Sequence, residues 1–211
     1  MDQVPGARCS GSFAIMETME TRALIDMLRT ELQHQLVRCA ELRQLPLAML
    51  HERPTPDRWS VMEVLQHMNL SSGHYLQILT RLYADENNRL RFRSSFTPGR
   101  WGDYFTNAMQ PSQEGAISWR MRTMDRFTPS PGEVVEWKAL DAFEAMCHSF
   151  IGLLERARTR GLEGEKVTST LGPILRLKVG DAFRFPIAHQ TRHMLQIQRV
   201  LHTLTELEAA R

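Results

Sequence analysis

The chain has 211 residues, of which 42% are hydrophobic and 24% charged, the composition of an ordinary globular protein. Its formal net charge of +2 is too small to indicate a nucleic-acid partner, and no apolar run approaches the roughly 18 residues that a membrane span requires. The three cysteines are widely spaced and form no CxxC pair, so we expect no disulfide framework and predict a reducing, cytoplasmic location.

Residues 1–14 contain proline, glycine and serine without an apolar stretch, and we expect a disordered leader rather than a signal peptide. Residues 15–211 are expected to form a single domain. Residues 15–45 carry leucines at three- and four-residue steps, which predicts a first long helix that ends near Pro46. Glu31 and His34 form an ExxH pair, but a di-iron bundle needs a second such pair, which the sequence lacks.

A second helix is predicted over residues 60–84. Ser60-Val61-Met62-Glu63 has the pattern of a capping box, so Glu63 is interpreted as a helix cap rather than a catalytic base. His67 lies at the edge of the apolar face of this helix, where an inward-facing ligand belongs. His74 shares the same stripe two turns later. We interpret it as a half-buried histidine that bonds to a neighbour, with a role around the site as the alternative.

Residues 85–137 have no sustained periodicity, yet they are too aromatic to be disordered. We expect an ordered excursion with a short helix around residues 102–109, packed across one end of the helices. The simplest interpretation of its arginines is a solvated rim. The alternative is a cationic lid that binds the carboxylates of an anionic substrate, with Arg93 and Arg100 as candidates. The arginines of the excursion are Arg89, Arg91, Arg93, Arg100, Arg120, Arg122 and Arg126.

Two further helices are predicted over residues 139–160, with Gly161 as the C-cap, and residues 182–209. Asp181 could cap the last helix, and Pro186 either begins that helix or bends it. Cys147 falls on an apolar face and is interpreted as an inert buried thiol. Four amphipathic segments predict an all-α fold, a four-helix bundle in which the long excursion between the second and third helices is a crossover connection.

The last helix contains Ala188-His189-Gln190-Thr191-Arg192-His193-Met194-Leu195-Gln196, in which His189 and His193 lie one turn apart on the same face. The HxxxH spacing alone is weak evidence, because a chain with 8 histidines in 211 residues contains it by chance roughly one time in three. Gln196 falls on the same stripe and is a candidate to orient a ligand.

His67 together with His189 and His193 would give three nitrogen ligands and an open position, the arrangement of a catalytic metal site. All-imidazole ligation suits zinc or nickel, with iron and manganese as alternatives. Such an ion lowers the pKa of a coordinated water or thiol and so produces a nucleophile at neutral pH.

The pattern Trp59-Ser60-x-x-Glu63-x-x-x-His67, followed by His189-x-x-x-His193-x-x-Gln196, resembles the DinB/YfiT-like superfamily, and the resemblance spans residues 23–207. It implies an up-down-down-up four-helix bundle, frequent homodimers, and a metal site at His67, His189 and His193. Activities in that superfamily include thiol-dependent S-transfer with a small cellular thiol, and isomerisation.

We therefore predict a metal-dependent enzyme that transfers a small cellular thiol to an electrophilic substrate, in a homodimer. The alternatives are a metal-dependent hydrolase that uses activated water, and a non-catalytic, stress-related bundle that binds metal. Neither a nucleic-acid nor a membrane partner is expected.

Overall fold

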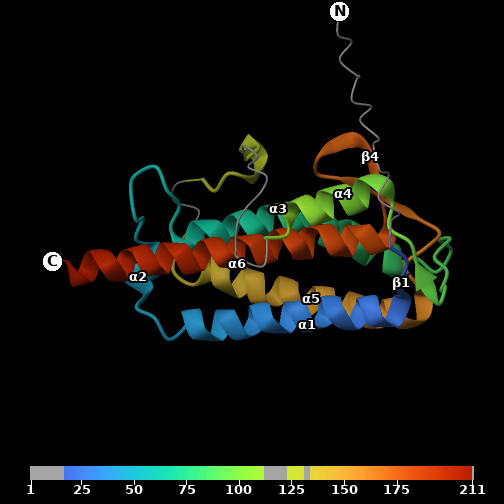
Figure 1. Cartoon of the computed structure of the whole chain (residues 1–211), viewed down its shortest axis with the longest axis horizontal. Coiled ribbons are helices and arrows are strands. Elements are labelled where there is room, and N and C mark those ends of the chain that lie inside the picture. Colours follow the sequence, from blue (N-terminus) through green and yellow to red (C-terminus); the bar gives the residue numbers. More distant parts are fainter. Residues whose placement is uncertain (1–16, 112–122, 131–133, 211) are drawn as a thin grey trace, which may run out of the picture.

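The computed structural model describes residues 17–111, 123–130 and 134–210, and it is mostly helical. Its four long helices are α1 (Thr21–Leu42), α3 (Val61–Ala84), α5 (Lys138–Arg160) and α6 (Val179–Ala209). Helices α1 and α3 each pack against both α5 and α6, and Figure 1 shows the four lying side by side. Their facing side chains form one buried apolar cluster, which includes Leu24, Ile25, Leu32, Leu65, Met68, Phe143, Phe150, Leu154, Phe183 and Ile197.

Shorter elements connect and flank these helices. They are α2 (Leu47–His51), α4 (Arg100–Met109) and the 3-10 helix η1 (Asp125–Phe127), with strands β1 (Met19–Glu20), β2 (Ser95–Phe96), β3 (Lys166–Ser169) and β4 (Gly172–Lys178). Strands β1 and β2 form one small antiparallel pair and β3 and β4 another. Helix α4 packs along α6, so this part of the excursion covers a side of that helix and not only one end (Figure 1). None of the helices in the described ranges is both long enough and apolar enough to cross a bilayer.

The start of α3 is fixed by the predicted capping box. The Ser60 hydroxyl accepts a hydrogen bond from the Glu63 N–H at 3.2 Å, and the Glu63 carboxylate accepts one from the Ser60 N–H at 2.8 Å. The same carboxylate forms an ion pair with Arg53. Because the cap determines where the helix begins, it also determines that His67, two turns later, faces the interior.

Two helices begin elsewhere than the sequence pattern suggests. Helix α1 starts at Thr21 instead of near residue 15, because Met19–Glu20 pair with β2 and the Glu20 carboxylate caps the helix by accepting from the Ala23 N–H. Helix α6 starts at Val179, and Pro186 lies inside it. The expectation that Asp181 caps α6 is wrong, since its carboxylate instead accepts from the Gly99 N–H and pairs with Arg184.

Candidate metal centre

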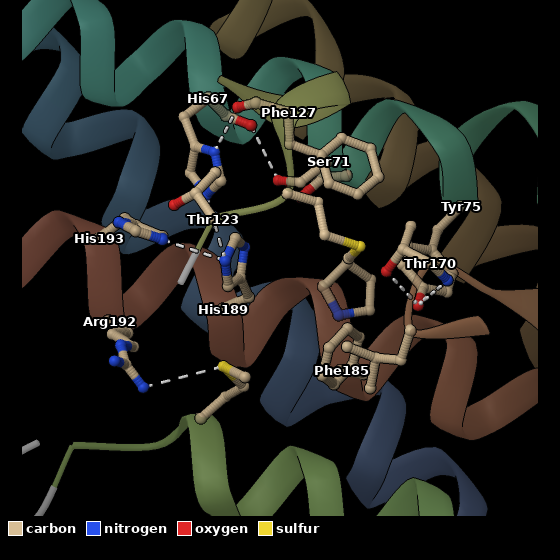
Figure 2. A pocket seen from close by; sticks show the side chains of 15 residues that line it. His67, Ser71, Tyr75, Thr123, Phe127, Thr170, Phe185, His189, Arg192 and His193 are labelled. Atoms are coloured by element: carbon tan, nitrogen blue, oxygen red, sulfur yellow. Dashed lines mark hydrogen bonds between the residues drawn. The ribbon is translucent and has the colours of Figure 1, made fainter. Parts of the chain in front are cut away.

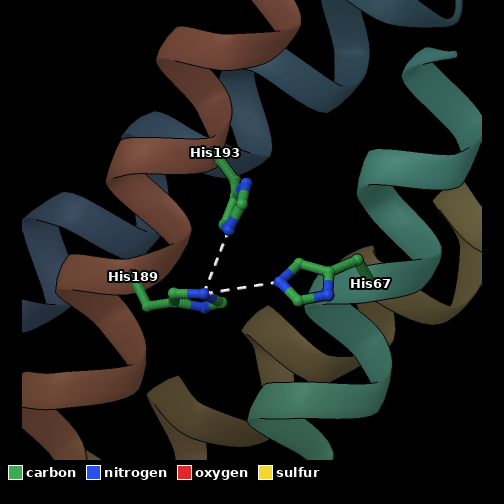
Figure 3. Close-up of side chains that lie close together, drawn as sticks. All are labelled: His67, His189 and His193. Atoms are coloured by element: carbon green, nitrogen blue, oxygen red, sulfur yellow. Dashed lines mark hydrogen bonds between the residues drawn. The ribbon is translucent and has the colours of Figure 1, made fainter. Parts of the chain in front are cut away.

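The packing of α3 against α6 brings three imidazoles together (Figure 3). The Nε2 atom of His189 lies 3.4 Å from Nε2 of His67 and 3.0 Å from Nε2 of His193. All the potential ligand atoms of this cluster are within 4.8 Å of one another. A tetrahedral zinc ion with bonds of about 2.0–2.1 Å holds its nitrogen ligands about 3.3 Å apart. The observed spacing therefore fits three ligands of one divalent ion.

Hydrogen bonds on the far side of two rings determine which nitrogen is free to bind. Nδ1 of His67 lies 2.7 Å from the backbone oxygen of Phe127, and Nδ1 of His193 lies 2.8 Å from Oε1 of Gln196. Because an oxygen of this kind only accepts, each Nδ1 carries the proton and each Nε2 presents a lone pair to the cluster. A neutral His189 can donate from Nε2 to only one of these two lone pairs. A cation among the three nitrogens satisfies all of them.

Burial keeps the three rings neutral. The side chain of His67 is only 4% exposed, and burial lowers the pKa of all three imidazoles. At His193, burial and the neighbouring His67 lower the pKa to about 3. The Arg192 guanidinium adds a smaller lowering of the pKa at His189 and His193. Neutral imidazole is the form that binds metal, so the cluster is ready to bind at neutral pH.

A cavity of about 90 Å³ opens on the free side of the cluster. Figure 2 shows the three histidines at one end of it and the hydroxyls of Tyr75 and Thr170 at the other. Its walls between these ends are largely apolar, and they are formed by Met109, Met124, Phe127, Leu171, Phe185 and Pro186. The arrangement combines nitrogen ligands with a small, mostly apolar cavity.

The segment that orients His67 is itself attached to the β3–β4 hairpin. Arg126 donates to the Thr170 carbonyl at 2.6 Å and lies over the Phe127 ring, 4.7 Å from its centroid. The Tyr75 hydroxyl lies 3.0 Å from the hydroxyls of both Ser169 and Thr170 and accepts from the Thr170 N–H. The hairpin, η1 and α3 are therefore connected around the cavity by hydrogen bonds.

The structure separates the other predicted site residues into two groups. Gln196 lies beside His193, as described above. His74 does not line the cavity and bonds through Nε2 to the Thr168 carbonyl at 2.9 Å. Arg93 and Arg100 are exposed and do not line the cavity, so the lid that the sequence suggested does not include them. Arg120 and Arg122 lie outside the described residues.

Three neighbours of the centre were missed by the sequence reasoning. The Phe127 carbonyl is a backbone atom, which no residue pattern identifies. Trp59, whose ring centroid is 5.1 Å from that of His67, belongs to the motif that opens α3, so its position was a usable signal. Arg192 falls on the polar side of a helical wheel, yet it lines the cavity.

Gln196→Ala is expected to weaken metal binding by about 10- to 100-fold, because the variant loses the acceptor that fixes the orientation and tautomer of His193. Titration with a competing chelator measures the affinity. Gln196→Glu keeps an acceptor oxygen and should bind at least as tightly as the wild type. Gln77→Ala, at an exposed position of α3, is the matched control. Wild-type affinity in Gln196→Ala would show that the His193–Gln196 bond is irrelevant to the centre.

Comparison with known proteins agrees with this geometry. Residues 29–197 match the family model described as DinB superfamily. No curated protein and no solved structure matches the chain. The matched range contains His67, His189 and His193, the capping box that positions the first of them, and Gln196. With a match over most of its length and a three-histidine cluster compatible with a divalent metal, the chain belongs to the DinB superfamily.

Proposed function

We propose that this protein is a metal-dependent enzyme that transfers a small thiol to an electrophilic substrate. The observation that carries the proposal is the convergence of three Nε2 atoms, from His67, His189 and His193, at the wall of a mostly apolar cavity. A structural metal site is enclosed by four protein ligands, whereas a catalytic one leaves a position for the reacting molecule. Three ligands beside a cavity correspond to the second kind.

The residues have distinct roles in this proposal. His67, His189 and His193 would hold the ion, for which zinc or nickel suits the all-nitrogen ligand set best, ahead of iron and manganese. The ion, when bound, lowers the pKa of a coordinated thiol and so makes it nucleophilic at neutral pH. Phe127 and Phe185 shield the reacting groups from water and offer apolar surface to the electrophile.

Among the described residues none supplies the reacting thiol, which we therefore assign to a molecule from solution. Cys39 and Cys147 are buried, and burial raises the pKa of both, that of Cys39 to about 12. Neither lines the cavity, so within the described residues no cysteine can serve as the nucleophile. In the transfer, the thiol loses its proton, its sulfur forms a bond to an electrophilic carbon, and the leaving group departs with the bonding electrons.

We also infer the finer architecture. Each long helix packs against two of the others, α1 and α3 against both α5 and α6, as in a closed four-helix bundle. Two antiparallel connections and one crossover between α3 and α5 would give the up-down-down-up order. In that order α3 and α6 are antiparallel neighbours, which suits a site built from the first turns of α3 and the middle of α6.

The test is conjugation of small thiols to monochlorobimane by the zinc-loaded protein, followed by fluorescence. His67→Ala is expected to lower the rate at least about a hundredfold, since removal of a ligand removes the ion that activates the thiol. His202→Ala, a solvent-exposed histidine of α6, should keep the wild-type rate. Turnover of simple esters without any thiol, lost in His67→Ala, would show that the protein is a hydrolase instead. Equal rates in wild type and His67→Ala would overturn the proposal.

A further inference from the structure

A groove of about 480 Å³ lies directly outside the three-histidine centre. It is separate from the inner cavity but shares Thr123, Arg192 and His193 with it. One wall is a stripe of α6 and the other is the segment before α3. The lining residues that matter here are Asp57, Arg58, Trp59, Arg192, Gln196 and Arg199. A ligand that occupies the groove therefore borders on the centre through His193.

The groove has an excess of positive charge. Three arginines, Arg58, Arg192 and Arg199, line it, against a single carboxylate, that of Asp57. The Asp57 carboxylate already accepts a hydrogen bond from the Thr55 hydroxyl at 2.6 Å. The nearby Arg53 is engaged in an ion pair with Glu63 and does not line the groove. Guanidinium groups bind carboxylates through two parallel hydrogen bonds, so the chemistry of this surface suits an organic acid.

The distance along α6 between His193 and Arg199 indicates how long a ligand must be to reach both the centre and the far arginine. Arg192, Gln196 and Arg199 are four and three residues apart and share one face of the helix. Arg199 is six residues beyond His193, which corresponds to about 9 Å along the helix axis. An extended peptide covers about 3.3–3.6 Å per residue, so this distance is about the length of a tripeptide. A molecule of that size can reach the centre with one end and Arg199 with the other.

We propose that this groove binds the carboxylates of the thiol co-substrate, and that the co-substrate is a carboxylate-bearing thiol of about tripeptide size. Arg58 and Arg199 bind its far end and Arg192 its near end, which places the sulfur at the three-histidine centre. The inference rests on the proposed thiol transfer for the identity of the reacting group. It assigns to this groove the carboxylate recognition that the sequence suggested for Arg93 and Arg100.

The test measures binding of S-methylglutathione, which keeps two carboxylates but has no free thiol, to the zinc-loaded protein by calorimetry. Arg58→Gln and Arg199→Gln are each expected to weaken binding about tenfold, because each variant loses one charge-assisted contact. The double variant should bind more weakly than either. Arg156→Gln, an exposed arginine on α5 outside the groove, is the matched control and should bind as the wild type does.

The outcomes distinguish the groove from the metal centre and from the reaction. Binding that depends on Arg58 and Arg199 and persists in His193→Ala supports the groove. Binding that is lost in His193→Ala but unchanged in both arginine variants would mean that a carboxylate ligates the ion, and it would overturn the proposal, as would the absence of wild-type binding. If monochlorobimane conjugation fails while S-methylglutathione binding still requires the arginines, thiol transfer is wrong and the carboxylate site stands.

Discussion

Purified protein is expected to contain about one equivalent of a divalent transition metal per chain, and His193→Ala less than about a tenth of that. With one of three ligands removed, the remaining His67 and His189 cannot hold the ion against a weak chelator. Elemental analysis by mass spectrometry after gel filtration measures the content directly. It also identifies the metal.

The metal should also stabilise the fold. An ion present at a thousand times its dissociation constant adds about 4 kcal/mol to the free energy of unfolding. In a domain of this size, removal of the ion should therefore lower the melting temperature by roughly 8–16 °C. His202→Ala is the control, because this histidine lies on the same helix with 74% of its side chain exposed. Equal metal content in wild type and His193→Ala would show that the three-histidine cluster does not bind the metal.

Asp181→Ala is expected to lower the free energy of unfolding by about 3–5 kcal/mol, because it removes a partner of a buried charge. Asp181 is fully buried, and its carboxylate lies 2.9 Å from Nη1 of Arg184 and 2.7 Å from the Gly99 N–H. The other arm of Arg184 reaches Asp103 on α4 at 2.9 Å. These contacts attach α4 to the start of α6. A Cβ on Gly102 would overlap the Asp181 side chain, so the two helices touch at this point.

Chemical denaturation measures the change, with Asp26→Ala as the matched control. Asp26 forms ion pairs with Arg29 and Arg158, but its side chain is 55% exposed, and exposed pairs contribute about 0–1 kcal/mol. Because Met109 at the end of α4 lines the cavity, Asp181→Ala should also disturb ligand binding there. A loss no greater than that of Asp26→Ala would show that the carboxylate is dispensable for the packing of α4.

Much of the helical architecture was predictable because it depends on side-chain periodicity. Apolar residues at three- and four-residue steps indicate the long helices, and the Ser60–Glu63 pattern predicts where α3 begins. The same periodicity places His67, His189 and His193 at the edges of apolar faces, which is why these three could be selected from eight histidines. Gln196 was within reach of prediction for the same reason, since it lies three residues after His193.

The rest depends on contacts between distant segments. The start of α1 is determined by pairing with β2, some 75 residues later, and no local pattern contains that information. Two arginines of the outer groove, Arg192 and Arg58, come from a helix and from a loop that meet only in the folded chain. The many arginines of residues 85–137 instead suggested a cationic lid in that excursion, although Arg93 and Arg100 do not line the cavity.

The hydrogen-bond acceptors that orient His67 and His193 differ in how easily mutation can remove them. The carbonyl that orients His67 belongs to the backbone at residue 127, so any amino acid there retains the acceptor as long as the chain keeps its path. The acceptor for His193 is a side chain, which a single nucleotide change can delete. Substitutions at position 127 therefore leave the orientation of His67 unchanged, whereas a substitution at position 196 changes that of His193. Among variants of this protein, metal affinity should therefore be adjusted mainly at position 196.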